Sequence, residues 1–313
     1  MRTRVFRGFL FFPLSFLLFS CATFSPVPSG KAPAASPGTV VPEWLPFAAG
    51  RTRGLFLCAG KILEPRLEFR ALRVDLSSPE LYILTSGGPG DSCAVSGEGG
   101  GSGNGGNARA LPGVRVSRFA GRNGLLAAIN ATPFDTVTAR EGVMLSPAGI
   151  VVSGGRLISA PNGRFDALVF CTGGGAAIVS QSGIAGPEGI ENAAGGFHRI
   201  LGNGELTGRA LNSGSRHARS AAGLSDDART LFLLVIDGRR PGSIGATEAE
   251  TAVLLARLGA REGINLDGGG SSALALRFPD GKTRIANIPS HGGIPGRERA
   301  VAVCLGIGLR TEN

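Results

Sequence analysis

Two short apolar segments, 231–236 and 264–266, each end in an aspartate followed by a glycine, at Asp237 and Asp267. The first is an uninterrupted apolar run with β-branched residues, which is typical of a strand buried on both faces. The spacing between the two leaves room for one helix, so the pattern predicts a strand, a crossover helix and a parallel strand. Both aspartates would then lie at the same edge of the sheet, where open α/β sheets bind their ligands.

The segment between the two aspartates carries clear signals for one helix. Thr247 and Glu250 have the spacing of a capping box, in which each side chain satisfies a free backbone amide of the first turn. Gly259 follows at the position of a left-handed C-cap. The face expected to be buried repeats at i, i+3, i+4 and i+7, at Thr251, Leu254, Leu255 and Leu258.

Outside this segment the chain has many strand signals and few helix signals. Further strands are expected within 67–84, 125–129, 143–158, 165–181 and 300–309, and a hairpin is expected at 273–288 around Asp280 and Gly281. The predicted fold class is α+β, with a strand-rich mixed sheet, a βαβ unit at residues 231–267 and a single catalytic domain.

The N-terminus is expected to be a targeting segment. Residues 1–21 combine a basic start with a short apolar stretch that ends at Cys21, as in a lipoprotein-type signal peptide. Lipidation of Cys21 would tether the exported protein to a membrane of the cell envelope; the alternatives are an ordinary cleaved signal peptide and an uncleaved anchor. Residues 22–50 are rich in Pro, Ala and Ser and are expected to form a disordered tether. The domain is expected over 51–313, with a flexible glycine-rich insertion at 87–107.

Charge and cysteine content narrow the possible partners. The net charge of +9 comes almost entirely from arginine, which suits an anionic substrate as well as a solvated basic surface. Nucleic acid is not expected as a partner, because aromatic residues make up only 6% and no recognition motif is present. Cys58, Cys171 and Cys304 lie in apolar runs and are expected in the core. With Cys93 they make four cysteines, and an exported location permits one disulfide, whose pairing the sequence does not assign. No Cys/His spacing resembles a zinc site.

Six short motifs occur in a fixed order along the chain. They are Ala128-Ile129-Asn130 with Phe134; 194–204; 216–223 with Arg216 and Arg219; Asp237-Gly238-Arg239; Leu266-Asp267-Gly268-Gly269-Gly270-Ser271-Ser272; and 287–301 with Arg299. Together they resemble the phosphodiester glycosidase family over roughly residues 60–310. The resemblance implies hydrolysis of a sugar joined through its anomeric oxygen to a phosphodiester, which releases free sugar and leaves a phosphomonoester.

The chemistry of the motif residues agrees with that reaction class. Asp267 and Asp237 are the candidate catalytic carboxylates, for stabilising an oxocarbenium-like sugar or activating water. Arginines can hold the phosphate, whose negative charge increases as the glycosidic bond breaks. The candidate substrate-binding residues are Asn130, Arg216, Arg219, Arg239, Arg299 and the turn Gly268, Gly269, Gly270, Ser271 and Ser272, whose amides could cradle an anion.

Each of these residues also has a purely structural interpretation. An aspartate can cap a turn, Asn130 can close an Asx turn, and the glycine turn can be a tight connection. Glu248 could reach the site or simply stabilise the start of the helix, and His291 could line the site or lie on the surface. The two aspartates could also bind a divalent cation, although no full ligand set is visible. No organic cofactor is expected.

Two departures from the family pattern keep other functions open. The family usually has Asn-Gly-Gly-Phe-Phe where this chain has Asn130-Ala131-Thr132-Pro133-Phe134, and Pro133 stiffens that loop. The change at 219–223 is milder. The expected function is therefore hydrolysis of sugar-1-phosphodiesters on envelope or exopolysaccharide-type glycans. The alternatives are a metal-dependent phosphodiesterase that cleaves P–O and a non-catalytic polysaccharide-binding lipoprotein. The sugar, the aglycone and the oligomeric state are left open.

Overall fold

The structure is a computed structural model that describes residues 43–47, 52–88 and 110–310. The predicted signal peptide with Cys21, most of the predicted tether, Cys93 and nearly all of the glycine-rich insertion lie outside the described residues. Among the residues described, no helix combines the length and the apolar character needed to cross a membrane.

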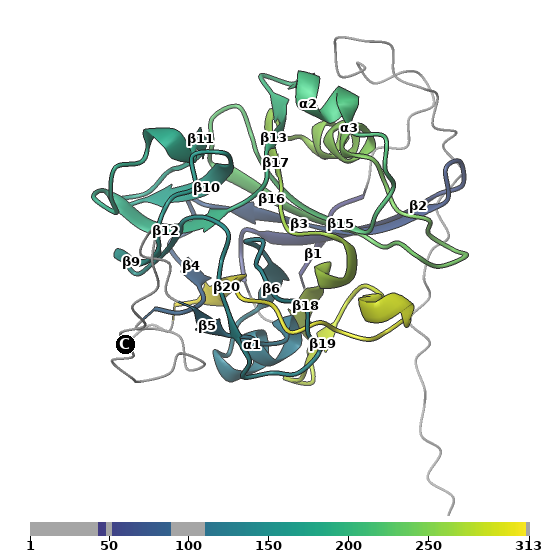
Figure 1. Ribbon diagram of the computed structural model, residues 1–313, viewed down its shortest axis with the longest axis horizontal. Helices are drawn as coiled ribbons and strands as arrows, with labels where there is room; N and C mark the ends of the chain where they lie inside the picture. Colours follow the sequence, from purple (N-terminus) through teal and green to yellow (C-terminus); the bar gives the residue numbers. More distant parts are fainter. Residues whose placement is uncertain (1–42, 48–51, 89–109, 311–313) are drawn as a thin grey trace, which may run out of the picture.

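The described chain is built mainly from three antiparallel sheets (Figure 1). The central sheet has, in spatial order, β1 (Leu45–Pro46), β2 (Leu55–Ile62), β3 (Leu67–Asp75), β16 (Thr230–Ile236), β15 (Arg219–Leu224), β17 (Glu262–Asn265), β13 (Arg199–Gly202) and β14 (Glu205–Leu206). The second has β11 (Ala176–Ser180), β10 (Asp166–Cys171), β12 (Ile190–Gly195), β8 (Val151–Ser153) and β9 (Arg156–Ser159). The third has β19 (Thr283–Ile285), β18 (Leu274–Arg277), β6 (Ala127–Asn130), β20 (Cys304–Leu309) and β4 (Leu81–Thr85). A small pair consists of β5 (Leu111–Pro112) and β7 (Met144–Leu145).

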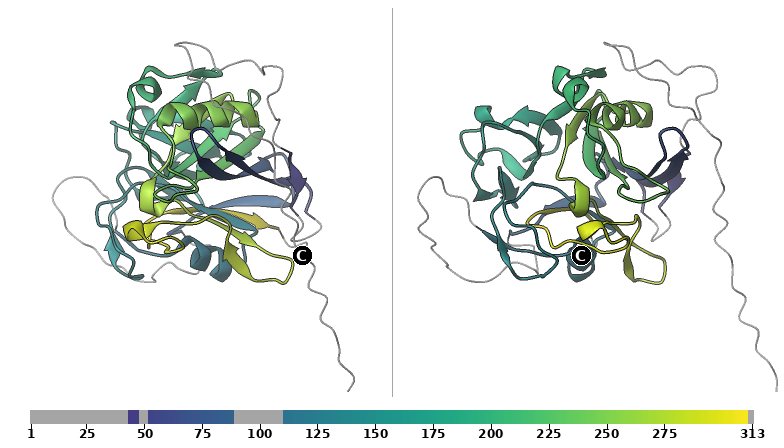
Figure 2. Two further views of the ribbon diagram at one scale, coloured as in Figure 1. Left: turned by 90° about the vertical axis from the view of Figure 1, so that its right-hand side faces the viewer. Right: turned by 45° about the vertical axis from the view of Figure 1, so that its right-hand side comes forward.

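Helices are few and short. The α-helices are α1 (Val116–Arg122), α2 (Gly208–Asn212) and α3 (Glu248–Leu258), and the 3-10 helices are η1 (Gln181–Gly183), η2 (Gly269–Ser271) and η3 (His291–Gly293). Helices α2 and α3 cover one face of the central sheet, and the third sheet with α1 lies on the opposite face (Figures 1 and 2). The strand-rich α+β class is therefore confirmed.

Two apolar layers hold this arrangement together. One lies between the central and third sheets and contains Leu233 and Val235 of β16 with Ile129 of β6. The other lies under α3 and contains Leu234 and Ile236 of the same strand β16. Strand β16 therefore sends alternate side chains into both layers, which explains why its sequence is an unbroken apolar run.

The predicted strand–helix–strand unit is present but differs in one respect. Strands β16 and β17 both pair antiparallel with β15, so they are parallel to each other with β15 between them. The two parallel strands are thus not hydrogen-bonded to each other, and the pairs between named strands in the described chain are antiparallel. The inserted strand comes from residues 219–224, which precede the unit in the sequence.

The predicted helix signals are all realised in α3. Thr247 and Glu250 form the reciprocal capping box, and Gly259 ends the helix in the left-handed conformation with φ 113°. Two sheet glycines let this helix lie close to the sheet. A Cβ at Gly223 would lie 2.7 Å from the Cβ of Ala260, and one at Gly263 would lie 2.9 Å from Leu255.

The folded region reaches further toward the N-terminus than the boundary expected at residue 51. Strand β1 pairs with β2, and Trp44 lies 6.1 Å from Phe232, measured between ring centroids. Of the cysteines expected in the core, Cys58 and Cys304 are buried, whereas Cys171 is partly exposed at the end of β10.

The close packing around Gly223 of β15 predicts that an added side chain there destabilises the fold. Gly223→Ala should lower the free energy of unfolding by about 1–3 kcal/mol, because the new methyl meets Ala260 and the carbonyl of Glu262 at 2.9 Å. Gly208→Ala, at the first position of α2 with no atom within 4 Å of its added Cβ, is the matched control. It should leave that free energy unchanged or raise it by up to about 1 kcal/mol. Chemical denaturation of both variants checks this, and equal losses would contradict it.

Candidate active site

Asp267 lies directly after β17 and is held in place through its backbone. Its amide donates to the carbonyl of Ala131 at 2.9 Å, and its own carbonyl accepts from Nδ2 of Asn130 at 2.6 Å. Asn130 is fully buried, and its Oδ1 accepts from Oγ of Ser220 at 2.7 Å and from the amide of Ala273 at 3.1 Å. The side chain of Asn130 is enclosed and holds the backbone of Asp267, which favours a positioning role for Asn130 over contact with the substrate.

The carboxylate of Asp267 lies in an environment that opposes its ionisation. Burial raises its pKa to about 6, against the lowering effects of hydrogen bonds from the Ser271 hydroxyl and the Gly268 amide and of the charge on Arg299. The residue nevertheless keeps partial exposure to solvent. A carboxyl group with a pKa near 6 can exchange a proton with a substrate or with water near neutral pH.

Arg299 provides one positive charge beside Asp267. Its Nη1 donates to Oγ of Ser271 at 3.1 Å, and its Nε donates to Nδ1 of His291 at 3.1 Å. The pKa of His291 is lowered by burial and by Arg299, Arg297 and Arg239, which favours the neutral ring that can accept this bond. The pKa of Arg299 is itself lowered, first by burial, although Asp267 opposes the change.

A buried carboxylate fixes the segment that carries Arg299. Glu298 accepts from the amide of Ser117 at 3.1 Å and from its hydroxyl at 2.5 Å, at the first turn of α1. Burial raises the pKa of Glu298, while the bonds from Ser117 lower it. Glu298 thereby anchors the backbone next to Arg299.

Arg239 provides a second positive charge beside the turn that follows Asp267. Within the described parts of the chain its exposed guanidinium makes no hydrogen bond or ion pair. Its Nη2 lies 3.0 Å from where a Cβ of Gly269 would be, which places it over the turn after Asp267. The backbone of Arg239 is in the left-handed region with φ 61°, a conformation that non-glycine residues adopt mainly where structure or function requires it.

The glycines of the turn after Asp267 permit close approach of these arginines. A Cβ at Gly270 would lie 2.5 Å from Nη2 of Arg299, and one at Gly268 would lie 2.9 Å from the carbonyl of Ala218. Gly269 has φ 62°, where a side chain would be strained. The glycines thus let the two cations and a neighbouring strand contact the turn directly.

Most of the amides that were expected to cradle phosphate are already bonded within the protein. The amides of Gly269, Ser271 and Ser272 donate to the carbonyls of Ala218, Gly268 and Gly269, at 2.7, 3.2 and 3.3 Å. These bonds fold residues 269–271 into η2, so their donors are already used. The hydroxyl of Ser271 contacts Asp267 and Arg299, whereas that of Ser272 is buried and has no partner in the described structure.

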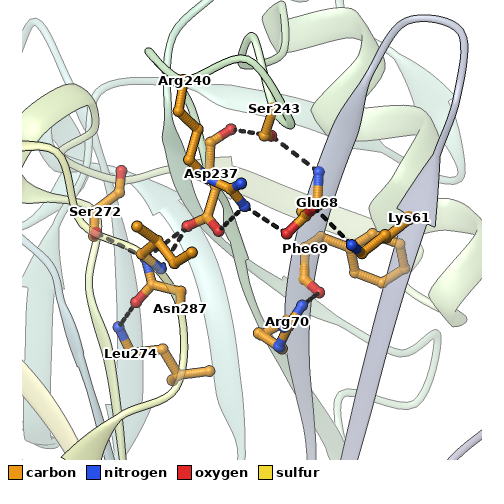
Figure 3. A network of polar contacts seen from close by, with 11 residues as sticks. Lys61, Glu68, Phe69, Arg70, Asp237, Arg240, Ser243, Ser272, Leu274 and Asn287 are labelled. Atoms are coloured by element: carbon orange, nitrogen blue, oxygen red, sulfur yellow. Dashed lines mark hydrogen bonds and ion pairs between the residues drawn. The ribbon is translucent and has the colours of Figure 1, made fainter. Parts of the chain in front are cut away.

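Asp237, the other candidate carboxylate, is the centre of a buried structural network (Figure 3). Its Oδ1 accepts from Nδ2 of Asn287 at 2.9 Å and from the amide of Ile288 at 3.0 Å. Its Oδ2 accepts from Nη2 of Arg240 at 2.9 Å, and Arg240 also pairs with Glu68. With 2% exposure and both oxygens bonded, Asp237 ties three segments together, which favours its structural role over the catalytic one.

The two aspartates have separate surroundings. Asp237 bonds to Arg240, Asn287 and the amide of Ile288. Asp267 lies beyond the end of β17, where its carboxylate contacts Ser271 and the charge of Arg299, and Arg239 lies over the same turn.

Arg216 and Arg219 are bound by two glutamates at the start of α3. Arg216 forms a two-pronged pair with Glu250, in which its Nη1 lies 2.6 Å from Oε2. Arg219 is buried and donates to the carbonyls of Ala246 and Ser215, both at 2.9 Å, while its Nη1 lies 3.5 Å from Oε1 of Glu248. Arg216 and Arg219 are thus already paired, unlike Arg239.

Asn265 was not selected from the sequence, and it lies beside Glu248, for which a place near the site was one of two interpretations. Ala221 of β15 pairs with Asn265, and continuing that register places Arg219 opposite Asp267. Nδ2 of Asn265 lies 3.4 Å from Oε1 of Glu248, so Asn265 joins the carboxylate of α3 to the edge of β17. The available signal was spacing, because Asn265 precedes Asp267 by two residues, the separation of side chains on one face of an extended segment.

In the parts of the chain that the structure describes, no three His, Cys, Asp or Glu side chains lie together as a metal ion would need.

Comparisons with known proteins agree with this architecture. A model of the phosphodiester glycosidase family matches residues 123–308. The fold is similar to the catalytic domain of zebrafish N-acetylglucosamine-1-phosphodiester alpha-N-acetylglucosaminidase, auto-inhibited by its pro-peptide. That match has 22% identity and a TM-score of 0.57, and covers 90% of this chain and 88% of the other.

Two bacterial structures share the fold at lower identity. A hypothetical protein from Synechocystis matches with 15% identity and a TM-score of 0.56, over 83% of this chain and 63% of the other. A Burkholderia pseudomallei protein described as exported matches with 17% identity and a TM-score of 0.51, over 77% and 74%. No curated protein matches the chain by sequence.

Substitution of Asp237 distinguishes a structural role of this residue from a catalytic one. Asp237→Ala should lower the free energy of unfolding by about 3 kcal/mol, because Arg240 and Asn287 lose a buried acceptor. Asp280→Ala breaks an exposed pair with Arg284 and should change stability little. Denaturation and turnover are measured on both variants. A folded Asp237→Ala variant of unchanged stability that has lost turnover would show a catalytic role instead.

Proposed function

The chain belongs to the phosphodiester glycosidase family, and we propose that it hydrolyses the bond between the anomeric carbon of a sugar and a phosphodiester oxygen, using Asp267, Arg239 and Arg299. The observation that carries the proposal is the juxtaposition of one carboxyl group of raised pKa with two arginines that, among the described residues, donate a hydrogen bond to no carboxylate. The two arginines can stabilise an anionic leaving group, and the carboxylate can accept a proton.

The reaction balances with these groups alone. Water attacks the anomeric carbon, the bond from that carbon to the phosphate oxygen breaks, and the electron pair leaves with the oxygen. The phosphate group thereby changes from one negative charge to two, which Arg239 and Arg299 stabilise. The ionised Asp267 stabilises the positively charged sugar and accepts the proton that water loses. Because a phosphomonoester is a fairly good leaving group, a strong general acid is not required.

We further propose that the substrate is a glycan of the cell envelope or an exopolysaccharide-type polymer. This finer statement is supported by the basic and apolar start of the sequence, which is typical of an exported lipoprotein anchored at Cys21. The arginine-rich composition suits such an anionic polymer.

The assignment of Asp267 is tested by substitution. Asp267→Asn should lower kcat for UDP-N-acetylglucosamine and simpler sugar-1-phosphodiesters by about 10²–10⁴-fold, measured as released reducing sugar. Asp280→Asn, in the exposed β18–β19 hairpin, is the matched control and should retain full activity. Activity should also survive EDTA, and a loss of turnover in EDTA would favour a metal-dependent reaction.

The bond that breaks is identified by running the reaction in ¹⁸O-labelled water. Cleavage at carbon leaves the phosphomonoester unlabelled, whereas cleavage at phosphorus places the label in it. Labelled phosphate would overturn the proposal in favour of a phosphodiesterase. Saturable binding of these compounds by the folded protein without turnover would favour a binding protein.

The pKa of Asp267 predicts how activity and stability depend on pH. Because the ionised form is the active one, kcat/KM should rise as pH increases through about 6. Stability should change in the opposite direction, since a carboxyl group with a raised pKa binds its proton more tightly when folded. Its contribution is greatest below the unfolded pKa and is lost as pH rises toward about 6.

Both pH profiles, of kcat/KM and of stability, are measured on the parent protein and on Asp267→Asn. The variant lacks the titrating group, so the difference between the two proteins reports on Asp267. Activity that falls through pH 6 would show that the protonated form of Asp267 acts instead.

A further inference from the structure

Three aromatic rings cluster beside β17, the strand that leads to Asp267. Phe165 precedes β10, and Phe197 and His198 connect β12 to β13. The Phe165 and Phe197 rings are perpendicular with centroids 5.6 Å apart, and His198 lies 5.7 Å from Phe165 and 6.4 Å from Phe197. All three residues are partly exposed, so the cluster is not part of the closed core.

Backbone pairing connects this cluster to the strand that carries Asp267. The amide of Phe197 donates to the carbonyl of Asn265 at 2.8 Å, and the amide of Asn265 donates to the carbonyl of His198 at 3.0 Å. The pairing ends two residues before Asp267. The rings therefore belong to a segment fixed beside the proposed catalytic carboxylate rather than to a remote surface.

Two polar side chains next to the rings have unused hydrogen-bonding capacity. Asn265 is 3% exposed, and its Oδ1 has no partner in the described part of the chain. A buried acceptor without a partner is unfavourable, so the position suits a donor from a bound molecule. The side chain of Glu248 is 13% exposed, and its contacts with Arg219 and Asn265, at 3.5 and 3.4 Å, both involve Oε1.

His198 is joined to Asn265 through the backbone, because its carbonyl accepts from the amide of Asn265 at 3.0 Å. The pKa of His198 is lowered by burial and by Arg209, while Glu248 and Asp166 act in the opposite direction. A neutral imidazole provides both a flat face and a hydrogen-bonding edge.

Resting on the function proposed above, we propose that Phe165, Phe197 and His198 form the surface that binds the sugar ring, with Glu248 and Asn265 contacting its hydroxyl groups. Aromatic faces with a few fixed polar groups are the usual composition of small-molecule sites. The phosphate would lie at the opposite end, on Arg239 and Arg299, and the anomeric carbon would lie between the two ends at Asp267. This arrangement assigns a direction to the substrate across the site.

The chain allows a direct test because it has only three histidines. His198 belongs to the proposed sugar surface, while His291 and His217 are both close enough to Arg239 to be affected by its charge. The imidazole proton resonances of the full protein are assigned with single His→Gln variants. Free N-acetylglucosamine, glucose, galactose and mannose are then titrated separately, and inorganic phosphate in a parallel series.

At least one sugar should shift the His198 resonance and leave that of His291 unchanged, and phosphate should do the reverse. A sugar that shifts His291 or His217 instead, or four sugars that leave His198 unmoved, would overturn the sugar surface. Phosphate that fails to shift His291 would instead contradict the phosphate site of the proposed function, so the two failures are distinguishable.

A pair of variants tests the aromatic contribution by the same measurement. Phe197→Leu should raise the apparent Kd of the sugar that shifts His198 by about tenfold. Phe278→Leu, a partly exposed phenylalanine beside Arg284 in the β18–β19 hairpin, is the matched control and should leave that Kd unchanged. An unchanged Kd in a folded Phe197→Leu variant would overturn the assignment.

Discussion

The buried side-chain amide of Asn130 is the interaction on which the arrangement of the site depends. It lies at the end of β6 in the third sheet, bonds to Ser220 of β15 in the central sheet, and holds the carbonyl of Asp267. One enclosed group thus fixes the separation of two sheets and the position of the proposed catalytic residue. Because a buried amide with unsatisfied atoms is unfavourable, its full set of partners makes this geometry specific. The replaced residues of the 130–134 loop do not disturb it, since Ala131 contributes through its backbone carbonyl.

Around that fixed point, charge is distributed unevenly among the arginines. Arg216 and Arg219 are matched by Glu250 and Glu248, so their charges are largely balanced within the protein. Arg299 is held by neutral groups, Ser271 and His291, and Arg239 by no polar group in the described residues. Of these four arginines, the two that lie beside Asp267 are therefore those with no hydrogen-bonded carboxylate among the described residues. Burial nevertheless outweighs these charges in setting the pKa of Asp267, which shows that enclosure is the dominant effect there.

The sequence predicted local features well and spatial ones less well. The α3 helix, its caps and the two aspartates at strand ends follow from spacing that is visible in the chain. The insertion of β15 between β16 and β17 could not be predicted, because its residues lie outside the unit and carry no pairing signal. The roles of Asp237 and Asp267 were also indistinguishable, since a strand buried on both faces has no alternation to show which way its last residue points. Only the side-chain contacts of each aspartate in the folded protein separate the two.

The structure also changes what the glycine-rich turn means for the proposed chemistry. A turn whose amides cradled phosphate would bind the substrate and the product through fixed dipoles. Here those amides are used internally, and the glycines instead admit two guanidinium groups to the same space. A full charge responds more strongly than a dipole when the phosphate changes from one negative charge to two. Interactions that strengthen as the bond breaks are those that accelerate a reaction, whereas equal binding of substrate and transition state does not. Because Gly269 and Gly270 have no side chains, the guanidinium groups of Arg239 and Arg299 can lie where the leaving group develops its negative charge.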